Sequence, residues 1–365
     1  MSKDAADRAF MQAALSLARR TLGRAAPNPA VGCVIVADGR VVGRGWTQPG
    51  GRPHAETEAL KRAGSAARGA TAYVTLEPCS HHGRTPPCTD AMIAAGIARV
   101  VVPHLDPDPR VNGAGFAKLR AAGIAVDIGL CETEGQEVNE GFLLAKKAAR
   151  PMVTLKLASS LDGAIATAAG ESKWITGELA RRRAHLIRSQ HDAILIGSGT
   201  ALADNPRLDV RLPGMEARAP LRVVLDGRQR VGESLDLVQR AGEQRTLIFT
   251  GEGAVHPLGE QPGLEICGVR QTNEGLAPDA VLAALARRGV TRVMIEGGAE
   301  IAATFLKADL VDRICWFRAP QVVGGDGQAA VSGWGVAHLT DAPRFARVRV
   351  ERLEEDLLES LRRAR

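Results

Sequence analysis

One histidine, one glutamate and two cysteines in the first quarter of the chain have the types and order of a catalytic zinc site. His54 stands two residues before Glu56, and Cys79 and Cys88 follow a run typical of a strand. An imidazole and two thiolates fill three positions of a tetrahedral zinc ion and leave the fourth open for water. Zinc makes that water acidic near neutral pH, and Glu56 is the predicted catalytic residue that carries its protons.

The order of these residues resembles the zinc deaminase signature, His-x-Glu followed by Pro-Cys-x-x-Cys. Here eight residues, rather than two, separate Cys79 from Cys88. Two structural cysteines beside a surface histidine would be the alternative, but His54, Glu56 and Pro78 all fall in the expected order. We therefore expect hydrolytic deamination of a flat heterocycle.

The loop between the two cysteines is expected to select the substrate. His81, Arg84 and Thr85 offer hydrogen-bond donors and cations that could hold a phosphate group. For His81 alone, a solvated surface loop explains the residue equally well. Asn28 stands between two prolines, where its amide could contact the heterocycle or merely serve the turn.

Strands and helices must alternate to position these side chains. Residues 31–36 and 41–46 are predicted to form a hairpin, because Asp-Gly lies between them. Residues 71–76 are predicted to be a buried strand that delivers Cys79 at its carboxyl end, where ligands collect in open α/β sheets. His54 is expected at the start of a helix.

The second half lacks the Gly-x-Gly-x-x-Gly fingerprint of dinucleotide-binding sites. Residues 293–296 instead lead into Gly297 and Gly298, and the amides of such a turn can cradle a phosphate, although a glycine pair alone is more often a simple turn. A second glycine loop is expected at residues 197–200. Arg228, after a third strand, could favour NADPH over NADH, or could belong to a solvated turn.

Composition limits the possible classes of protein. A chain of 365 residues favours two domains. The net charge of +6 would suit nucleic acid or anionic small molecules, but the 47 Lys and Arg residues form no long block. Aromatic residues make up 3%, which argues against a single-strand nucleic-acid binder. No apolar run approaches the roughly 20 residues of a membrane span. The N-terminus lacks the pattern of a signal peptide, so a cytoplasmic location is expected.

Taken together, these motifs resemble the bifunctional deaminase–reductase family of riboflavin biosynthesis. The matching segments are residues 27–32, 54–56, 77–88, 160–163, 170–176 and 296–298. The resemblance implies an α/β protein with two domains. A cytidine-deaminase-like three-layer α/β/α domain would occupy residues 1–147, and a dihydrofolate-reductase-like α/β domain would occupy residues 151–365.

The resemblance also implies cofactors and site residues. Zinc would bind to His54, Cys79 and Cys88. NADPH would be contacted in the second domain by Ala158, Trp174, Thr200, Asp204 and Gly298. Substrate contacts in that domain would come from Ser172, Arg188, Leu208, Arg211 and Glu296.

The implied substrate is a small phosphorylated pyrimidine, 2,5-diamino-6-(5-phosphoribosylamino)pyrimidin-4-one. It would be deaminated first, and its ribosyl group would then be reduced to ribityl. The protein would be a homo-oligomer, a dimer or a tetramer, with no nucleic-acid or membrane partner. No general acid for the reduction is apparent from the sequence.

Two positions depart from the family pattern. The family often has Asp-Pro-Asn-Pro where this chain has Asp106-Pro107-Asp108-Pro109. Asp106 remains a predicted substrate contact, but at Asp108 a carboxylate replaces the expected amide. Gly227 stands where a small hydroxyl residue is expected, which leaves any phosphate there to Arg228 or the backbone.

Two other classes remain open. A nucleic-acid deaminase of the tRNA-editing type with an accessory domain would need a basic face around the zinc site, and its RNA binding would weaken steeply with salt. A structural zinc module would unfold when the metal is removed.

Overall fold

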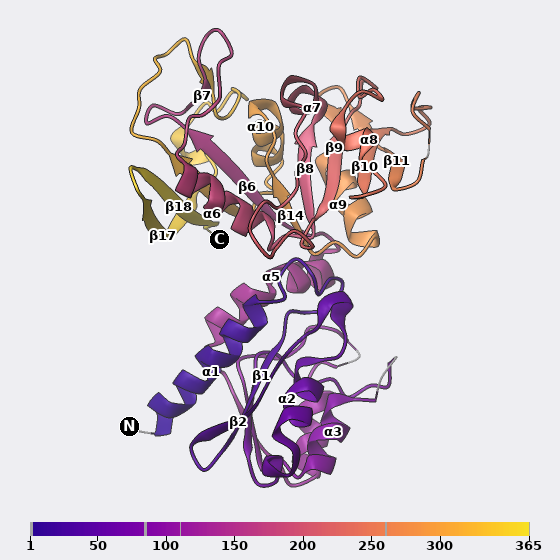
Figure 1. The fold of residues 1–365 in the computed structure, drawn as a ribbon, viewed down its shortest axis with the longest axis vertical. Coiled ribbons are helices and arrows are strands. Elements are labelled where there is room, and N and C mark those ends of the chain that lie inside the picture. The colour runs from indigo at the N-terminus through magenta and orange to yellow at the C-terminus, as the bar shows by residue number, and fades with distance from the viewer. Residues whose placement is uncertain (1–2, 84–85, 110, 260, 365) are drawn as a thin grey trace. The chain divides into compact units, whose positions relative to one another are not determined.

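The computed structural model describes residues 3–83, 86–109, 111–259 and 261–364. The chain divides into two compact units, Met1–Ala149 and Arg150–Arg365, and Figure 1 shows the elements of each. Within the described ranges, no helix is long and apolar enough to cross a membrane.

The first unit is built on a five-stranded sheet with strand order β2-β1-β3-β4-β5. β1 runs antiparallel to β2 and β3, whereas β3, β4 and β5 are parallel. The strands are β1 (Gly32–Ala37), β2 (Arg40–Trp46), β3 (Thr71–Val74), β4 (Arg99–Val102) and β5 (Ala125–Ile128). Asp38 and Gly39 both have positive φ, as a tight two-residue hairpin turn requires.

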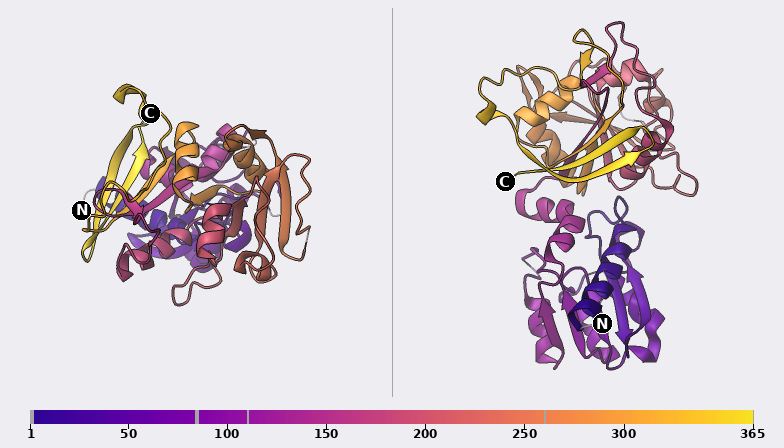
Figure 2. Two further views of the ribbon diagram at one scale, coloured as in Figure 1. Left: turned by 90° about the horizontal axis from the view of Figure 1, so that it is seen from above. Right: turned by 90° about the vertical axis from the view of Figure 1, so that its left-hand side faces the viewer.

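Helices cover both faces of this sheet (Figures 1 and 2). Side chains alternate along β1, so that Cys33 and Ile35 enter one apolar core while Val34 and Val36 enter the other. The first core also includes residues of α2 (Ala55–Ala63), α3 (Cys88–Ala95) and α4 (Ala114–Ala121). The second includes residues of α1 (Lys3–Arg19) and α5 (Glu132–Ala148). The unit therefore has three layers, α/β/α.

Glycines on β2 bring α2 close to the sheet. A Cβ atom at Gly45 would lie 2.0 Å from the backbone oxygen of Ala55, and one at Gly43 would lie 2.3 Å from that of Ala59. Only hydrogen fits at these positions. The start of α2 is therefore fixed on β2, and short 3-10 turns precede and follow the helix, η1 (Pro49–Gly51) and η2 (Gly64–Ala67).

The second unit is built on a nine-stranded sheet with order β11-β10-β9-β8-β14-β6-β15-β18-β17. The neighbours from β11 to β15 are parallel, and the β17–β18 hairpin adds antiparallel strands at one edge. These strands are β6 (Met152–Ser159), β8 (Ala193–Gly197), β9 (Leu221–Leu225), β10 (Thr246–Gly251), β11 (Leu264–Val269), β14 (Arg292–Ile295), β15 (Arg313–Arg318), β17 (Phe345–Leu353) and β18 (Asp356–Arg363).

Two apolar cores flank this larger sheet as well. Buried residues of α9 (Pro278–Arg287) and α10 (Ala299–Lys307) belong to one core. Buried residues of α6 (Glu178–Arg188), α7 (Ser198–Asp204) and α8 (Asp236–Gln239) belong to the other. Two small sheets pair β7 (Ala164–Ala166) with β16 (Gln328–Ala329) and β12 (Gln271–Thr272) with β13 (Gly275–Leu276), and η3 (Leu339–Asp341) precedes β17.

Candidate zinc centre and reductase site

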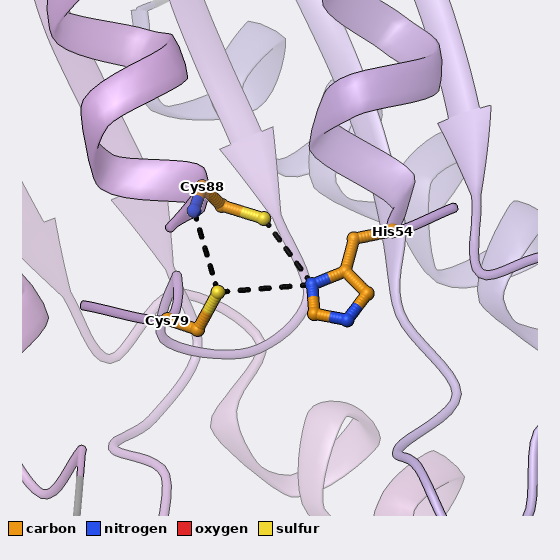
Figure 3. Close-up of side chains that lie close together, drawn as sticks. All are labelled: His54, Cys79 and Cys88. Carbon is orange, nitrogen blue, oxygen red and sulfur yellow. Dashed lines mark hydrogen bonds between the residues drawn. The ribbon is translucent and has the colours of Figure 1, made fainter. Parts of the chain in front are cut away.

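Three elements bring the predicted zinc ligands to one point. His54 directly precedes α2, Cys79 follows β3, and Cys88 is the first residue of α3. The Nδ1 atom of His54 lies 3.3 Å from the Sγ of Cys88 and 3.7 Å from the Sγ of Cys79. Figure 3 shows both cysteine side chains directed at the same ring nitrogen. The three donor atoms all lie within 4.8 Å of one another.

This donor set fits a tetrahedral zinc ion. Zinc–nitrogen bonds of about 2.0 Å and zinc–sulfur bonds of about 2.3 Å place the two donors about 3.5 Å apart at a tetrahedral angle. The two nitrogen–sulfur distances in the structure, 3.3 and 3.7 Å, lie on either side of that separation. With three protein donors, a tetrahedral ion would keep one position open.

The pKa values of the two thiols are shifted in opposite directions. The Cys88 side chain donates a hydrogen bond to Cys79 and, with a further one from His54, lowers the pKa of Cys79 to about 4. The hydrogen bond to Cys79, together with burial, raises the pKa of Cys88 well above its usual value. The backbone amide of Cys88 also lies 3.3 Å from the Cys79 sulfur. A cation bound by both sulfurs would favour loss of the thiol protons.

Glu56 lies in the first turn of α2 and is 3% exposed. Burial raises the pKa of its carboxyl group, although the neighbouring His54 opposes the shift. A carboxyl group whose pKa is raised toward the working pH can both accept and return a proton. The Glu56 side chain also forms a hydrogen bond with the side chain of Cys88, one of the three predicted ligands.

The other predicted contacts of the deaminase lie on loops. Asn28 packs against Gly51 in the turn before His54, where a Cβ atom on Gly51 would lie 1.8 Å from Asn28 Nδ2. His81 is partly buried, and its Nδ1 has no hydrogen-bond partner among the described residues. Arg84 and Thr85 lie outside the described residues.

The two aspartates of the Asp-Pro-Asp-Pro turn are both buried. Burial raises the pKa of Asp106 to about 6, and the negative charges of Asp108 and Glu77 add to the effect. Asp108, the departure from the family pattern, forms an ion pair of 3.0 Å with Lys146 on α5. The carboxylate at this position is therefore balanced by a cation within the same unit.

In the second unit, an ion pair joins two of the predicted substrate residues. Arg188, on α6, donates to both carboxylate oxygens of Glu296, at 2.8 and 2.9 Å, and Glu296 directly follows β14. Burial opposes ionisation of Glu296, but the Arg188 guanidinium outweighs it and lowers the pKa of Glu296 to about 2. The two hydrogen bonds fix the charged groups of the pair at the carboxyl ends of the parallel strands.

Sequence reasoning missed Lys156, whose amine could serve as a general acid. It lies on β6, two residues before Ala158, so the two side chains share one face of the strand. Burial lowers the pKa of the Lys156 amine, while the Glu296 carboxylate opposes the shift. A single lysine within the apolar run of residues 152–157 was the available signal.

The predicted cofactor residues Thr200 and Gly298 come together, because the amide of Gly298 donates to Thr200 Oγ1 at 3.1 Å. A glycine loop was expected at residues 197–200, but Gly197 ends β8 and Ser198 begins the short helix α7. Small side chains here permit either conformation, and Ala201 packs into the apolar core, which favours the helix. Asp204 ends α7 and is exposed.

The remaining predicted residues of the second unit differ in exposure and in their contacts. Trp174 is 67% exposed and stacks with the Arg181 guanidinium at 4.7 Å, while Ser172 is partly buried in the same segment. Leu208 is buried, and Arg211 is exposed, with a 3.0 Å bond to Asp209. The described contacts thus link Arg188 with Glu296, and Thr200 with Gly298, but show no contact between Ser172 and either pair.

Two models of known protein families match the chain, one in each of its two units. The model of the cytidine and deoxycytidylate deaminase zinc-binding region matches residues 4–104, and that of the RibD C-terminal domain matches residues 151–358. These matches confirm the predicted α/β class, a deaminase domain followed by a reductase domain.

Full-length relatives cover nearly the whole chain. The riboflavin biosynthesis protein RibD of Aquifex aeolicus is 41% identical over 352 residues, 96% of this chain and 97% of that protein. That of Escherichia coli is 42% identical over 350 residues, 93% and 94% of the two chains. A solved structure of Acinetobacter baumannii RibD has a TM-score of 0.89 at 36% identity and full coverage of both chains. The chain therefore belongs to the RibD family, the bifunctional deaminase–reductases of riboflavin biosynthesis.

Proposed function

We propose that this chain deaminates 2,5-diamino-6-(5-phosphoribosylamino)pyrimidin-4-one and then reduces the ribosyl group of the product to ribityl with NADPH. The observation that carries the first step is the convergence of His54, Cys79 and Cys88 within 4.8 Å beside the buried Glu56. A solved relative from Thermotoga maritima, 36% identical with a TM-score of 0.89, is described as a diaminohydroxyphosphoribosylaminopyrimidine deaminase and 5-amino-6-(5-phosphoribosylamino)uracil reductase.

In the deaminase unit, His54, Cys79 and Cys88 would hold zinc, which when bound supplies a Lewis acid that acidifies water near neutral pH. Glu56 takes the proton of the attacking water and passes it to the departing amine nitrogen. Its burial suits this role, because the carboxyl group is shielded from bulk solvent and has a raised pKa. Asn28, His81, Arg84, Thr85 and Asp106 are the proposed contacts for the heterocycle and its phosphate.

In the reductase unit, NADPH bound near Ala158, Trp174, Thr200, Asp204 and Gly298 would supply a hydride. Conversion of ribosyl to ribityl places that hydride on C1 of the sugar, breaks the bond from C1 to the ring oxygen and puts a proton on that oxygen. Lys156 is the proposed donor, because its partly buried ammonium has a lowered pKa and therefore releases its proton readily. Ser172, Arg188, Leu208, Arg211 and Glu296 are the proposed substrate contacts.

Glu56→Gln separates the two activities. The amide cannot carry the proton, so ammonia release should fall by roughly 10²- to 10⁴-fold. Zinc content and NADPH-dependent reduction of supplied deaminated substrate should stay at the level of the unaltered chain. Ammonia release that survives the substitution would refute the role of Glu56.

We further propose a cytoplasmic homo-oligomer, a dimer or a tetramer, that does not act on nucleic acid. Six free cysteines support a reducing compartment. Light scattering on the purified chain tests the oligomer. Retention on tRNA at low salt tests the alternative deaminase class, and binding that weakens steeply with salt would favour that alternative.

A further inference from the structure

Glu77 connects the strand that leads to Cys79 with a segment some thirty residues further along the chain. It is 4% exposed, and its carboxylate accepts three backbone amides. Oε2 accepts from Asp106 at 3.2 Å and from Gly113 at 2.9 Å, while Oε1 accepts from Gly115 at 2.9 Å. One buried side chain therefore bonds both to the first residue of the turn that contains Asp106 and to the start of α4.

Glu77 also caps the amino-terminal end of α4, because the helix has no capping side chain of its own. The helix begins after Gly113, which has φ of 91° and no side chain to accept a hydrogen bond, and its first turn contains no acidic residue. The first amides of a helix need partners from outside it, and a negative charge at that end is favourable. The carboxylate of Glu77 meets both requirements from a different element.

The start of α4 packs tightly against the residue before Cys79. A Cβ atom at Gly115 would lie 2.3 Å from the backbone oxygen of Pro78 and 3.0 Å from Glu77 Oε1. On its other side, the backbone oxygen of Cys79 accepts from both the amide and the hydroxyl of Thr89, each at 3.2 Å. The position of Cys79 is thus fixed by two helices.

Asp106 is held in a single orientation by the same arrangement. Its amide is bonded to Glu77, and its Oδ1 accepts the amide of Asp108 at 2.8 Å. The side chain is 7% exposed, so it has little freedom to turn. The predicted substrate contact therefore depends on Glu77 for its placement relative to the strand end.

We propose that Glu77 is a positioning residue of the deaminase, which holds the Asp106 turn and the start of α4 against the strand end that bears Cys79. The proposal rests on the proposed function, because it assigns Asp106 to the substrate of that reaction. Glu77 itself contacts the loop backbone rather than the reacting atoms. Its loss should weaken substrate binding more than zinc binding.

Glu77→Gln tests this with almost unchanged shape. The new amide group turns a donor toward one or two backbone donors, which leaves them buried and unpaired. We expect KM for ammonia release to rise by roughly tenfold or more, with a smaller change in kcat and an unchanged zinc content. Glu77→Asp keeps the charge on a shorter side chain and should give a smaller rise.

Asp7→Asn is the matched control. Asp7 is another buried carboxylate of the first unit, and it accepts from Tyr73 Oη at 2.5 Å and from Arg99 at 2.7 Å. Asp7→Asn should lower the melting temperature of the first unit and leave KM unchanged. NADPH-dependent reduction should be unaffected in all three variants.

Two outcomes would overturn the proposal. A Glu77→Gln chain that loses thermal stability with KM unchanged, as expected of Asp7→Asn, would show a purely structural role. Loss of zinc from Glu77→Gln would show that Glu77 acts through Cys79 instead. If the unaltered chain released no ammonia at all, the proposed function would fail and the positioning role with it.

Discussion

At the scale of single residues, the spacing of Cys79 and Cys88 in the sequence does not reveal how the two thiols affect each other's pKa. The pKa of Cys79 is lowered and that of Cys88 is raised, and Nδ1 of His54 lies 3.7 and 3.3 Å from their sulfurs. Metal binding requires both thiols to be deprotonated, and the lowered pKa of Cys79 favours this at one of them.

Removal of one ligand should therefore remove the metal. Cys88→Ala leaves two donors, and we expect the bound zinc to fall from about one ion per chain to a small fraction of that. Atomic absorption on the purified protein measures it. Cys267→Ala, in the second unit, is the control and should keep full zinc content. Retention of zinc by Cys88→Ala would refute the assigned ligand set.

The role proposed for Lys156 predicts how the rate of reduction depends on pH. A proton donor must be protonated, so the reduction rate should fall as pH rises through the pKa of this amine. Because burial lowers that pKa, the fall should occur below the value of about 10.4 for a free lysine. Lys156→Met should reduce the rate by roughly 10²- to 10⁴-fold and leave ammonia release intact. An unchanged pH profile in Lys156→Met would exclude the role.

The Arg188–Glu296 pair should be visible in acid stability. The pKa of Glu296 is about 2 in the folded chain and lies near 4.5 when exposed, so its ionised form stabilises the fold above about pH 4.5. This contribution, on the order of 3 kcal/mol, is lost as pH falls from about 4.5 to 2. Urea unfolding at pH 7 and pH 3 should show a stability difference between the unaltered chain and Glu296→Gln that shrinks in acid. A difference independent of pH would contradict it.

At the scale of elements, the contact between α2 and β2 decides where His54 and Glu56 stand. Gly45→Val would place a branched side chain where a Cβ already lies 2.0 Å from the Ala55 oxygen. The start of α2 must then move, so we expect weaker zinc binding and much reduced ammonia release. Zinc titration and the ammonia assay measure these effects. Gly242→Ala, where a Cβ meets nothing within 4 Å, should behave normally.

Much of this element structure could be predicted from the sequence. The Asp38-Gly39 hairpin and the strand before Cys79 follow from turn chemistry and β-branched content. The helix α5 is less evident, because it contains Gly135 and Gly141 and begins after Cys131 at φ of 58°. Its burial against the first sheet stabilises it despite this weak propensity.

Part of the candidate site could likewise be predicted from the sequence, and part could not. The order of His54, Glu56, Cys79 and Cys88 is a local pattern, and it indicates the chemistry directly. The contacts of Glu77 with Asp106 and of Arg188 with Glu296 join residues far apart in the sequence, so no local pattern could reveal them. Lys156 was overlooked because its proposed role depends on its surroundings in the fold rather than on a motif.

At the scale of the whole molecule, the two units should respond independently to loss of metal. A chelator that removes zinc should abolish ammonia release and leave reduction of the supplied deaminated compound unchanged. Because the first unit has two apolar cores of its own, its circular dichroism should change little. Unfolding of the first unit on chelation would instead favour a structural zinc module.

The most direct measurement supplies the phosphoribosyl diaminopyrimidine and NADPH to the intact chain and follows ammonia and NADPH separately. We expect one ammonia released and one NADPH oxidised per substrate, with ammonia appearing first and continuing when NADPH is omitted. Oxidation of NADPH without prior ammonia release, or ammonia release that never leads to NADPH oxidation, would contradict a single chain that performs both steps.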